Sequence, residues 1–310
     1  MEFTEDILLQ VLNLRDQKRI SYADLAEQFY GDRSLGDSLR SATRAYKRRN
    51  SIHTILDPIG KLFGDTRTVP EKPTLVIGDT HCPYQNKKVL LQAFDMARKR
   101  GVTQLIHVGD LVDAASYNSQ AKGEQVTPIE TDIAHARSIL YTAYSMGFET
   151  WIVPGNHDMY YTKKTDISFS RFICEIVLDK RYNDGFHTTE FDYVYYGDFA
   201  ILGHLSSGYD PTPGKVAAAI ADKYNRHALI GHDHLFGYQK GQKGYYGISI
   251  GGMFVPDSFW YKSRSYNTFP HSMIGFCILE GGKIYMYDSF LNETILEPEN
   301  DNERYIPNPR

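Results

Sequence analysis

Metal-binding side chains recur in this sequence where short apolar runs end. Five sites place Asp, Asn or His directly after a glycine: Gly78-Asp79-Thr80-His81, Gly109-Asp110-Leu111-Val112-Asp113, Gly155-Asn156-His157-Asp158, Gly203-His204 and Gly231-His232-Asp233-His234. Carboxylate, amide and imidazole groups without a thiolate suit borderline divalent ions such as Mn²⁺, Fe²⁺ or Zn²⁺. Two such ions, held about 3.5–4 Å apart, stabilise in-line displacement at phosphorus. The pattern therefore predicts a dinuclear metal site suited to phosphoester chemistry.

The elements that must position these sites can be predicted from hydrophobic periodicity. Three apolar runs predict buried strands, at Thr74–Ile77, Gln104–Val108 and Thr150–Val153. Two amphipathic segments between them, Val89–Arg100 and Ile129–Met146, predict helices. This alternation favours a layered α/β domain, in which ligands bind beyond the carboxyl ends of the strands. A glycine before each candidate ligand suits a chain that turns sharply as it leaves a strand.

Taken in order, the motifs D-x-H, GD-x-x-D, GNHD, GH and GH-x-H resemble those of the calcineurin-like metallophosphoesterase superfamily. The resemblance covers roughly Thr74 to Ser289. It implies a four-layer α/β/β/α sandwich of two mixed sheets, and the closer spacing of strands after Phe191 agrees with a second, partly antiparallel sheet. The expected fold class is therefore α/β, with a small all-α domain before it.

The resemblance also implies a role for each motif residue. Seven residues are the expected ligands: Asp79, His81 and His234 for one ion, Asn156, His204 and His232 for the other, and Asp110 as the bridge. A hydroxide shared by the two ions would be the nucleophile, and His157, oriented by Asp113, would be the general acid. Mn²⁺ is the favoured ion, while Fe, Zn and Ni are alternatives for the same ligand set.

The chain is expected to divide into four parts. Residues 1–56 predict three helices, and residues 57–73 form a proline- and glycine-containing linker. Residues 74–290 would be the phosphoesterase domain, and residues 291–310 a polar C-terminal tail.

The second and third predicted helices join through a tight turn at Gly31, and Ser34 is the expected N-cap of the third. One face of that third helix carries Arg40, Arg44, Lys47 and Arg48. A basic second helix after a short turn is typical of a helix-turn-helix that contacts nucleic acid. A helical cap with a positive exposed face is an equally open interpretation.

Three functions remain open. The first is a nuclease or phosphodiesterase acting on DNA, with Arg264 and His271 as candidate cleft residues and the aromatic residues between Phe254 and Phe269 stacking bases or forming a lid. The second is a nucleotide phosphodiesterase or phosphatase, or a protein phosphatase, whose N-terminal helices serve oligomerisation. The third is a DNA-binding regulator without activity.

The first function is preferred, because a DNA reader joined to a phosphodiester-competent site is economical. Such chains also resemble phosphoesterases often carried by bacteriophages. Protein Ser/Thr phosphatases have an arginine directly after the second motif, whereas here Asp113 is followed by Ala114. The intact ligand set disfavours an inactive regulator.

Composition limits the remaining classes of protein. Against 34 basic residues there are 38 acidic ones, a formal charge of −4, so the chain is not a uniformly basic nucleic-acid binder. Three cysteines cannot form a disulfide framework for 310 residues. A secretory signal pattern and a long apolar run are both lacking. We therefore expect a soluble, cytoplasmic protein that does not bind membranes.

Overall fold

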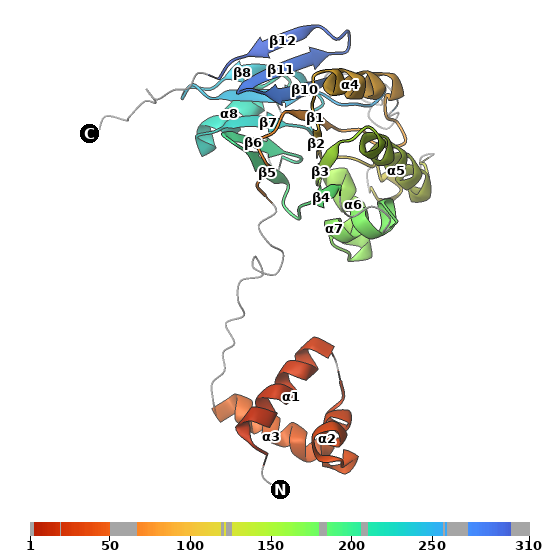
Figure 1. Ribbon diagram of the computed structural model, residues 1–310, viewed down its shortest axis with the longest axis vertical. Helices are drawn as coiled ribbons and strands as arrows, with labels where there is room; N and C mark the ends of the chain where they lie inside the picture. The colour runs from red at the N-terminus through yellow and green to blue at the C-terminus, as the bar shows by residue number, and fades with distance from the viewer. Residues whose placement is uncertain are drawn as a thin grey trace, which may run out of the picture. The chain divides into compact units, whose positions relative to one another are not determined.

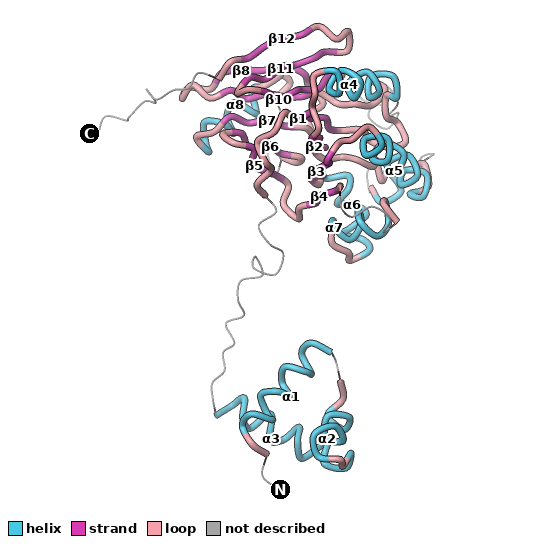
Figure 2. Tube along the Cα trace, in the orientation of Figure 1, coloured by secondary structure: helices cyan, strands magenta, loops and turns pink. Residues whose placement is uncertain are grey.

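The computed structural model describes residues 3–18, 20–49, 67–118, 121, 126–179, 185–205, 210–256, 258 and 272–298. The chain divides into two compact units, Met1–Gly64 and Asp65–Arg310. The first unit is helical, and the second combines sheets with helices (Figures 1 and 2). No described helix has the length and hydropathy needed to cross a bilayer.

The N-terminal unit contains the three helices expected from the sequence, together with a short 3-10 helix. They are α1 (Glu5–Lys18), α2 (Tyr22–Tyr30), η1 (Arg33–Leu35) and α3 (Gly36–Arg49). Their buried side chains form a small apolar core: Leu8, Val11, Leu25, Ala26 and Leu39. Helix α2 is capped at both ends, since the Ser21 hydroxyl accepts the Asp24 N–H at 3.1 Å and Gly31 is left-handed with a φ of 68°.

The turn between α2 and α3 differs from the prediction at Ser34. Asp32 is the capping residue there, because its Oδ1 accepts the Ser34 N–H at 2.9 Å and Ser34 itself lies inside η1. Helix α3 begins at Gly36, where a Cβ atom would lie 2.9 Å from the Ala23 Cα. Only glycine allows α2 and α3 to approach this closely.

The second unit is built on two mixed sheets. The larger has seven strands, in the order β12 (Glu293–Leu296), β11 (Lys283–Asp288), β10 (Gly275–Glu280), β1 (Thr74–Gly78), β2 (Gln104–Val108), β3 (Glu149–Val153) and β4 (Phe186–Thr188). Strands β1 to β4 are parallel, and β10 to β12 add to them antiparallel. The smaller has five strands, in the order β5 (Tyr193–Tyr196), β6 (Phe199–Leu202), β7 (His227–Ile230), β9 (Tyr246–Ile250) and β8 (Phe236–Lys240).

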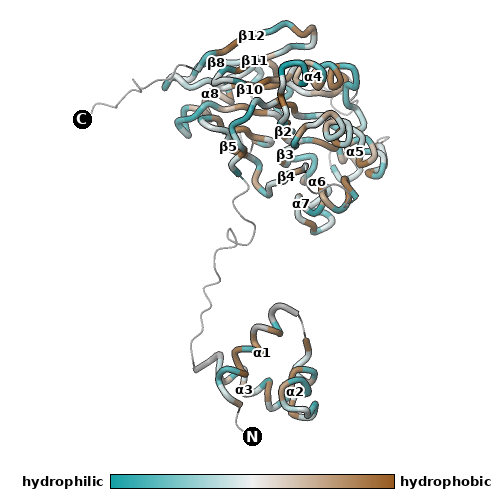
Figure 3. Tube along the Cα trace, viewed as in Figure 1, coloured by the Kyte–Doolittle hydropathy of each residue, from teal (hydrophilic) through white to brown (hydrophobic). Residues whose placement is uncertain are grey.

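Three apolar clusters separate four layers, which confirms the expected α/β/β/α sandwich. The described helices of this unit are α4 (Lys87–Lys99), η3 (Ala115–Tyr117), α5 (Ile129–Ser145), α6 (Asn156–Thr165), α7 (Phe169–Arg171), the π-helix η5 (Phe172–Val177) and α8 (Lys215–Tyr224). One cluster joins α4 and α5 to the larger sheet, and a second lies between the sheets. A third joins α8 to the smaller sheet. The interior strands are apolar over most of their length (Figure 3).

Both predicted boundaries of this unit need correction. The expected tail after residue 290 begins with strand β12, because Leu296 is buried between the sheets and anchors it. At the other end, Val69 is buried in the same cluster and donates its N–H to the Tyr195 carbonyl at 2.8 Å. Residues 67–73 therefore belong to the domain, and residues 57–66 of the expected linker lie outside the described residues.

Candidate metal centre

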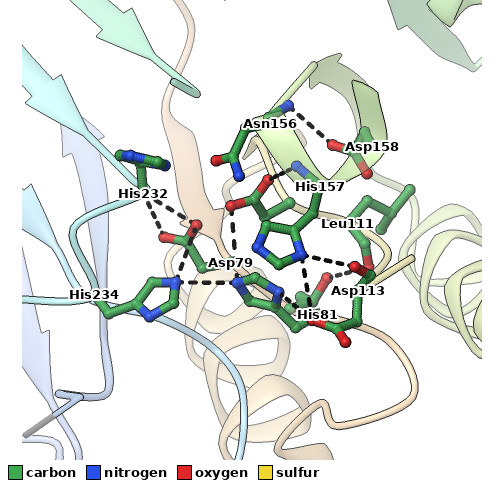
Figure 4. A network of polar contacts seen from close by, with 12 residues as sticks. Asp79, His81, Leu111, Asp113, Asn156, His157, Asp158, His232 and His234 are labelled. Carbon is green, nitrogen blue, oxygen red and sulfur yellow. Dashed lines mark hydrogen bonds and ion pairs between the residues drawn. The ribbon is translucent and has the colours of Figure 1, made fainter. Parts of the chain in front are cut away.

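The predicted ligands come from both sheets. Asp79, Asp110 and Asn156 follow β1, β2 and β3 of the larger sheet, while His204 and the pair His232 and His234 follow β6 and β7 of the smaller sheet. Figure 4 shows the side chains of Asp79, Asn156, His232 and His234 turned toward one another. The centre therefore lies where the carboxyl ends of the two sheets meet.

Three of these residues, Asp79, His81 and His234, form what we call the inner half of the centre. Together with Asp110 they offer ligand atoms that all lie within 4.8 Å of one another. All four side chains are buried, and the Nε2 atoms of His81 and His234 are 3.0 Å apart. Burial lowers the pKa of His81 to about 4, with a further contribution from His157, so its imidazole is neutral, as a metal ligand must be. This group could hold one divalent ion.

The other three predicted ligands, Asn156, His204 and His232, form the outer half. All three are partly exposed, and the rings of His204 and His232 lie edge to face with centroids 4.8 Å apart. Asn156 Oδ1 and His204 Nδ1 are buried atoms with no hydrogen-bond partner in the described part of the chain. Buried polar atoms are nearly always partnered, so a free oxygen and a free nitrogen beside the inner half fit the requirement of a second ion.

The backbone turns sharply at the ligands themselves. Positive φ angles occur at Asp79 (48°), His81 (42°), Asp110 (49°), His232 (71°) and His234 (56°). Left-handed backbone is costly for residues with a Cβ atom and persists only where the surrounding structure holds it, often at functional sites.

Most of the glycines before the predicted ligands do not provide the sharp turns expected from the sequence. Of the five, only Gly109 has a positive φ, at 70°. A Cβ atom at Gly155 would overlap the Asp110 carboxylate, and one at Gly203 would lie 2.6 Å from the Pro154 carbonyl oxygen. These glycines therefore allow the ligand loops to cross in close contact, while the ligands make the turns.

Backbone N–H groups fix the carboxylates. Both Asp79 oxygens accept the His232 N–H, at 3.0 and 2.9 Å, and Asp110 Oδ1 accepts the His157 N–H at 2.9 Å. Asp158, to which the sequence assigned no role, accepts from Gly155 and Val112 at 2.9 and 3.1 Å. It thus ties the second motif to the third. Its position in the first turn of α6 is a capping signal that was available in the sequence.

His157 is held beside this centre by Asp113. Its Nδ1 lies 2.7 Å from the Asp113 carbonyl oxygen and 3.3 Å from Asp113 Oδ1, which is also 3.1 Å from His81 Nδ1. Burial opposes ionisation of Asp113, but hydrogen bonds from His157 and His81 hold its pKa below the usual range. Because a carbonyl oxygen only accepts, Nδ1 carries the hydrogen, and Nε2 is the nitrogen that can exchange a proton with a substrate.

Several predicted residues are not brought to this centre by the described part of the structure. Outside the description lie Arg264, His271 and the side chains of Lys47 and Arg48. Phe254 is buried, with its ring centroid 4.7 Å from that of His234, so it packs against the inner half and does not stack a base. His107 is buried within β2, as expected of a core residue.

Residues 72–236, more than half of the chain, match the calcineurin-like phosphoesterase family. The chain belongs to this family. Similar solved structures include Yfce, a phosphoesterase from E. coli, with 11% identity, coverage of 73% of this chain and 100% of that one, and a TM-score of 0.41. A Zn²⁺ complex of Vps29 from Entamoeba histolytica has 14% identity, coverage of 73% and 98%, and a TM-score of 0.38. An archaeal phosphodiesterase has 14% identity, coverage of 73% and 99%, and a TM-score of 0.37.

No curated protein matches the sequence significantly. Family membership and the Asp/His cluster together make this protein a metal-dependent phosphoesterase.

Proposed function

We propose that this phosphoesterase is a phosphodiesterase that hydrolyses DNA, with its N-terminal helices forming a helix-turn-helix that binds the duplex. One observation carries the hydrolytic part: His157 is fixed through Nδ1 at the edge of the inner half, so Nε2 is the nitrogen able to protonate a leaving oxygen. Alkoxides, such as those released from DNA, are poor leaving groups, so a positioned acid matters most for them.

The proposed ligands are the seven expected from the sequence, with Asp110 between the inner and outer halves. Two divalent ions, when bound, neutralise the phosphoryl oxygens and activate a water molecule as nucleophile. The protein's own contribution is geometric: the His232 N–H orients Asp79, and the His157 N–H orients Asp110. Mn²⁺ is our choice among the ions that accept this ligand set.

Exposed arginines on α3 support the DNA part of the proposal. Arg40 and Arg44 are exposed, and the ion pair of Arg40 with Asp37 is long, at 3.8 Å, and open to water. Such a pair holds the guanidinium weakly and leaves it available to a phosphate. The short turn and the close approach of α2 and α3 at Gly36 support the helix-turn-helix proposal.

The hydrolytic proposal is tested with the full chain and Mn²⁺ on bis-p-nitrophenyl phosphate, single-stranded DNA and duplex DNA. We expect all three to be cleaved, and His157→Ala to lose about 10²-fold or more on DNA while it keeps its metal. His187→Ala on β4, a histidine that is hydrogen-bonded to Glu149 and is not among the proposed ligands, is the matched control. Cleavage of the aryl ester alone would refute DNA as substrate and favour the nucleotide-directed alternative.

The DNA-binding part is tested separately by Arg40→Ala combined with Arg44→Ala. Loss of two phosphate contacts should weaken duplex binding and reduce the slope of log affinity against log salt by about two. Arg98→Ala combined with Lys99→Ala on α4 removes the same charge from the other unit and serves as control. An unchanged slope would reduce the N-terminal helices to a structural or oligomerising role.

A further inference from the structure

The His157 ring is held by a peptide group whose other side is also held. The Asp113 carbonyl oxygen accepts from His157 Nδ1 at 2.7 Å, and the N–H of the same peptide unit, on Ala114, donates to Asp132 Oδ2 at 2.9 Å. A peptide unit is planar, so its carbonyl and N–H turn together. A bond that fixes the N–H therefore also fixes the carbonyl that holds the imidazole.

We propose that Asp132 is a positioning residue for the general acid, acting on His157 through the Asp113–Ala114 peptide. This inference rests on the proposed function, since it takes His157 to protonate the leaving group. Asp132 lies in the first turn of α5 and does not touch the metal ligands in any described contact.

The conformation of Ala114 shows why the peptide needs to be held. Its φ and ψ are 46° and 34°, a left-handed conformation that is unfavourable for alanine. Rotation of the peptide would relieve this strain and turn the carbonyl away from His157. Ala114 and Asp132 are both fully buried, so water cannot replace the hydrogen bond between them. Asp132 is thus the group that keeps the carbonyl in place.

The other contacts of Asp132 fit a role in holding this peptide in place. Its second oxygen accepts the Thr127 hydroxyl at 2.7 Å, so both of its described partners are neutral dipoles, and no described ion pair includes it. Burial raises its pKa to about 7. A buried carboxyl group without a cation is costly to the fold, so its hydrogen bond to the Ala114 peptide gives a reason for its presence.

The inference is tested with phosphodiesters whose leaving groups range from p-nitrophenol to unsubstituted phenol. An acid contributes most when the leaving group is poor, so Asp132→Ala should lose about tenfold or more on the phenyl ester and less than about threefold on the p-nitrophenyl ester. Asp132→Asn keeps an acceptor for the Ala114 N–H and should restore most of the lost rate.

Two further variants separate positioning from general damage. Thr127→Val removes the other hydrogen bond of Asp132, and its effect should be equal for all leaving groups. In a His157→Ala background, Asp132→Ala should cause no further loss, because the group it positions is gone. Metal content is measured for every variant.

Equal losses across the series, or the same loss with and without His157, would overturn the role of Asp132. The role also fails if His157→Ala itself shows no dependence on the leaving group, since the acid is then elsewhere. None of these test esters is DNA, so the result does not depend on whether DNA is the substrate. That question is tested by the cleavage assay on single-stranded and duplex DNA.

Stability against pH gives an independent check. The carboxyl pKa is raised from 3.8 to about 7, so the folded protein favours the protonated form and loses stability as pH rises between these values. Asp132→Asn lacks this loss, and its melting temperature relative to wild type should improve from pH 5 to pH 8. Within the described part of the chain, Asp113, Tyr84 and Cys82 are the titratable groups that interact electrostatically with Asp132, and all three remain in the variant. A constant difference would show that the pKa of Asp132 is not raised and would count against the buried, unpaired carboxyl group that this role assumes.

Discussion

The inner and outer halves of the metal centre differ in how much of their geometry the protein fixes in advance. Asp79 and His81 are fully buried, and both Asp79 oxygens are already engaged by a backbone N–H. Asn156 and His204 are partly exposed, and each has a buried atom without a partner among the described residues. One half is preorganised, whereas the other still offers free donor atoms.

This difference indicates a division of labour. A preorganised, buried site loses little entropy on binding an ion, and water reaches it poorly, so we expect its ion to be held tightly. The outer half is nearer to solvent and should exchange its ion and meet the substrate more readily. The predictions below test this division, starting from the residue that both halves share.

Asp110→Asn should have the largest effect. Asp110 is the proposed bridge, and loss of its charge weakens both ions, which together supply several kcal/mol to the transition state. Turnover should fall by about 10³-fold or more, with both ions depleted in metal analysis. Asp95→Asn, a partly exposed aspartate on α4 paired with Lys99, is the control. Retention of two ions and of activity would show that the halves are not joined through Asp110.

The two halves should respond differently to loss of a histidine. His234→Ala should lose the inner ion and with it nearly all activity at any Mn²⁺ concentration. His204→Ala should keep one ion, and excess Mn²⁺ should restore much of its rate. In His204→Ala the Mn²⁺ concentration that gives half-maximal activity should rise by more than about 100-fold. Changing a residue that only supports a ligand typically weakens metal binding by about 10–100-fold. Equal rescue of both variants would abolish the distinction.

Chelation of the wild-type protein should proceed in two steps. The outer ion should leave first and abolish hydrolysis, and the inner ion should leave at higher chelator concentration with a drop in melting temperature, since ions that bind only the folded state stabilise it. Activity, metal content and melting are followed in parallel. Loss of both ions in one step would contradict a tighter inner half.

The smallest effect is expected from Phe254→Leu. The Phe254 ring packs on the His81 and His234 rings, so its loss should loosen only the inner half. Inner-ion affinity should fall a few-fold, and the destabilisation should be less than the about 3–5 kcal/mol of a buried Phe→Ala change. Phe290→Leu, at a residue that is 84% exposed, is the control. A change confined to the outer ion would reverse the assignment.

Much of this fold and centre could be predicted because the signals are local. The first two strands were expected at Thr74–Ile77 and Gln104–Val108, and the structure places them there to within one residue. Ligand types and their position after a strand are likewise written in consecutive residues. This is why the inner-half residues could be proposed as ligands from the sequence alone.

What could not be predicted depends on residues that are distant in sequence. Nothing near Asp132 indicates that it bonds to Ala114, 18 residues earlier. The purpose of Gly155 appears only when the Asp110 carboxylate lies against it. The burial of Leu296 depends on the pairing of β12 with β11, and its polar neighbours in the sequence resemble a tail, so the sequence does not predict this burial.

Because the centre draws on both sheets, activity should depend on the folding of the whole domain. The proposed ligands are shared between the two sheets, so we expect a chain in which only one sheet has folded to lack a complete metal centre. Such control matters most if DNA is the substrate, as proposed above. On this architecture the enzyme can become active only once both sheets have folded and packed together.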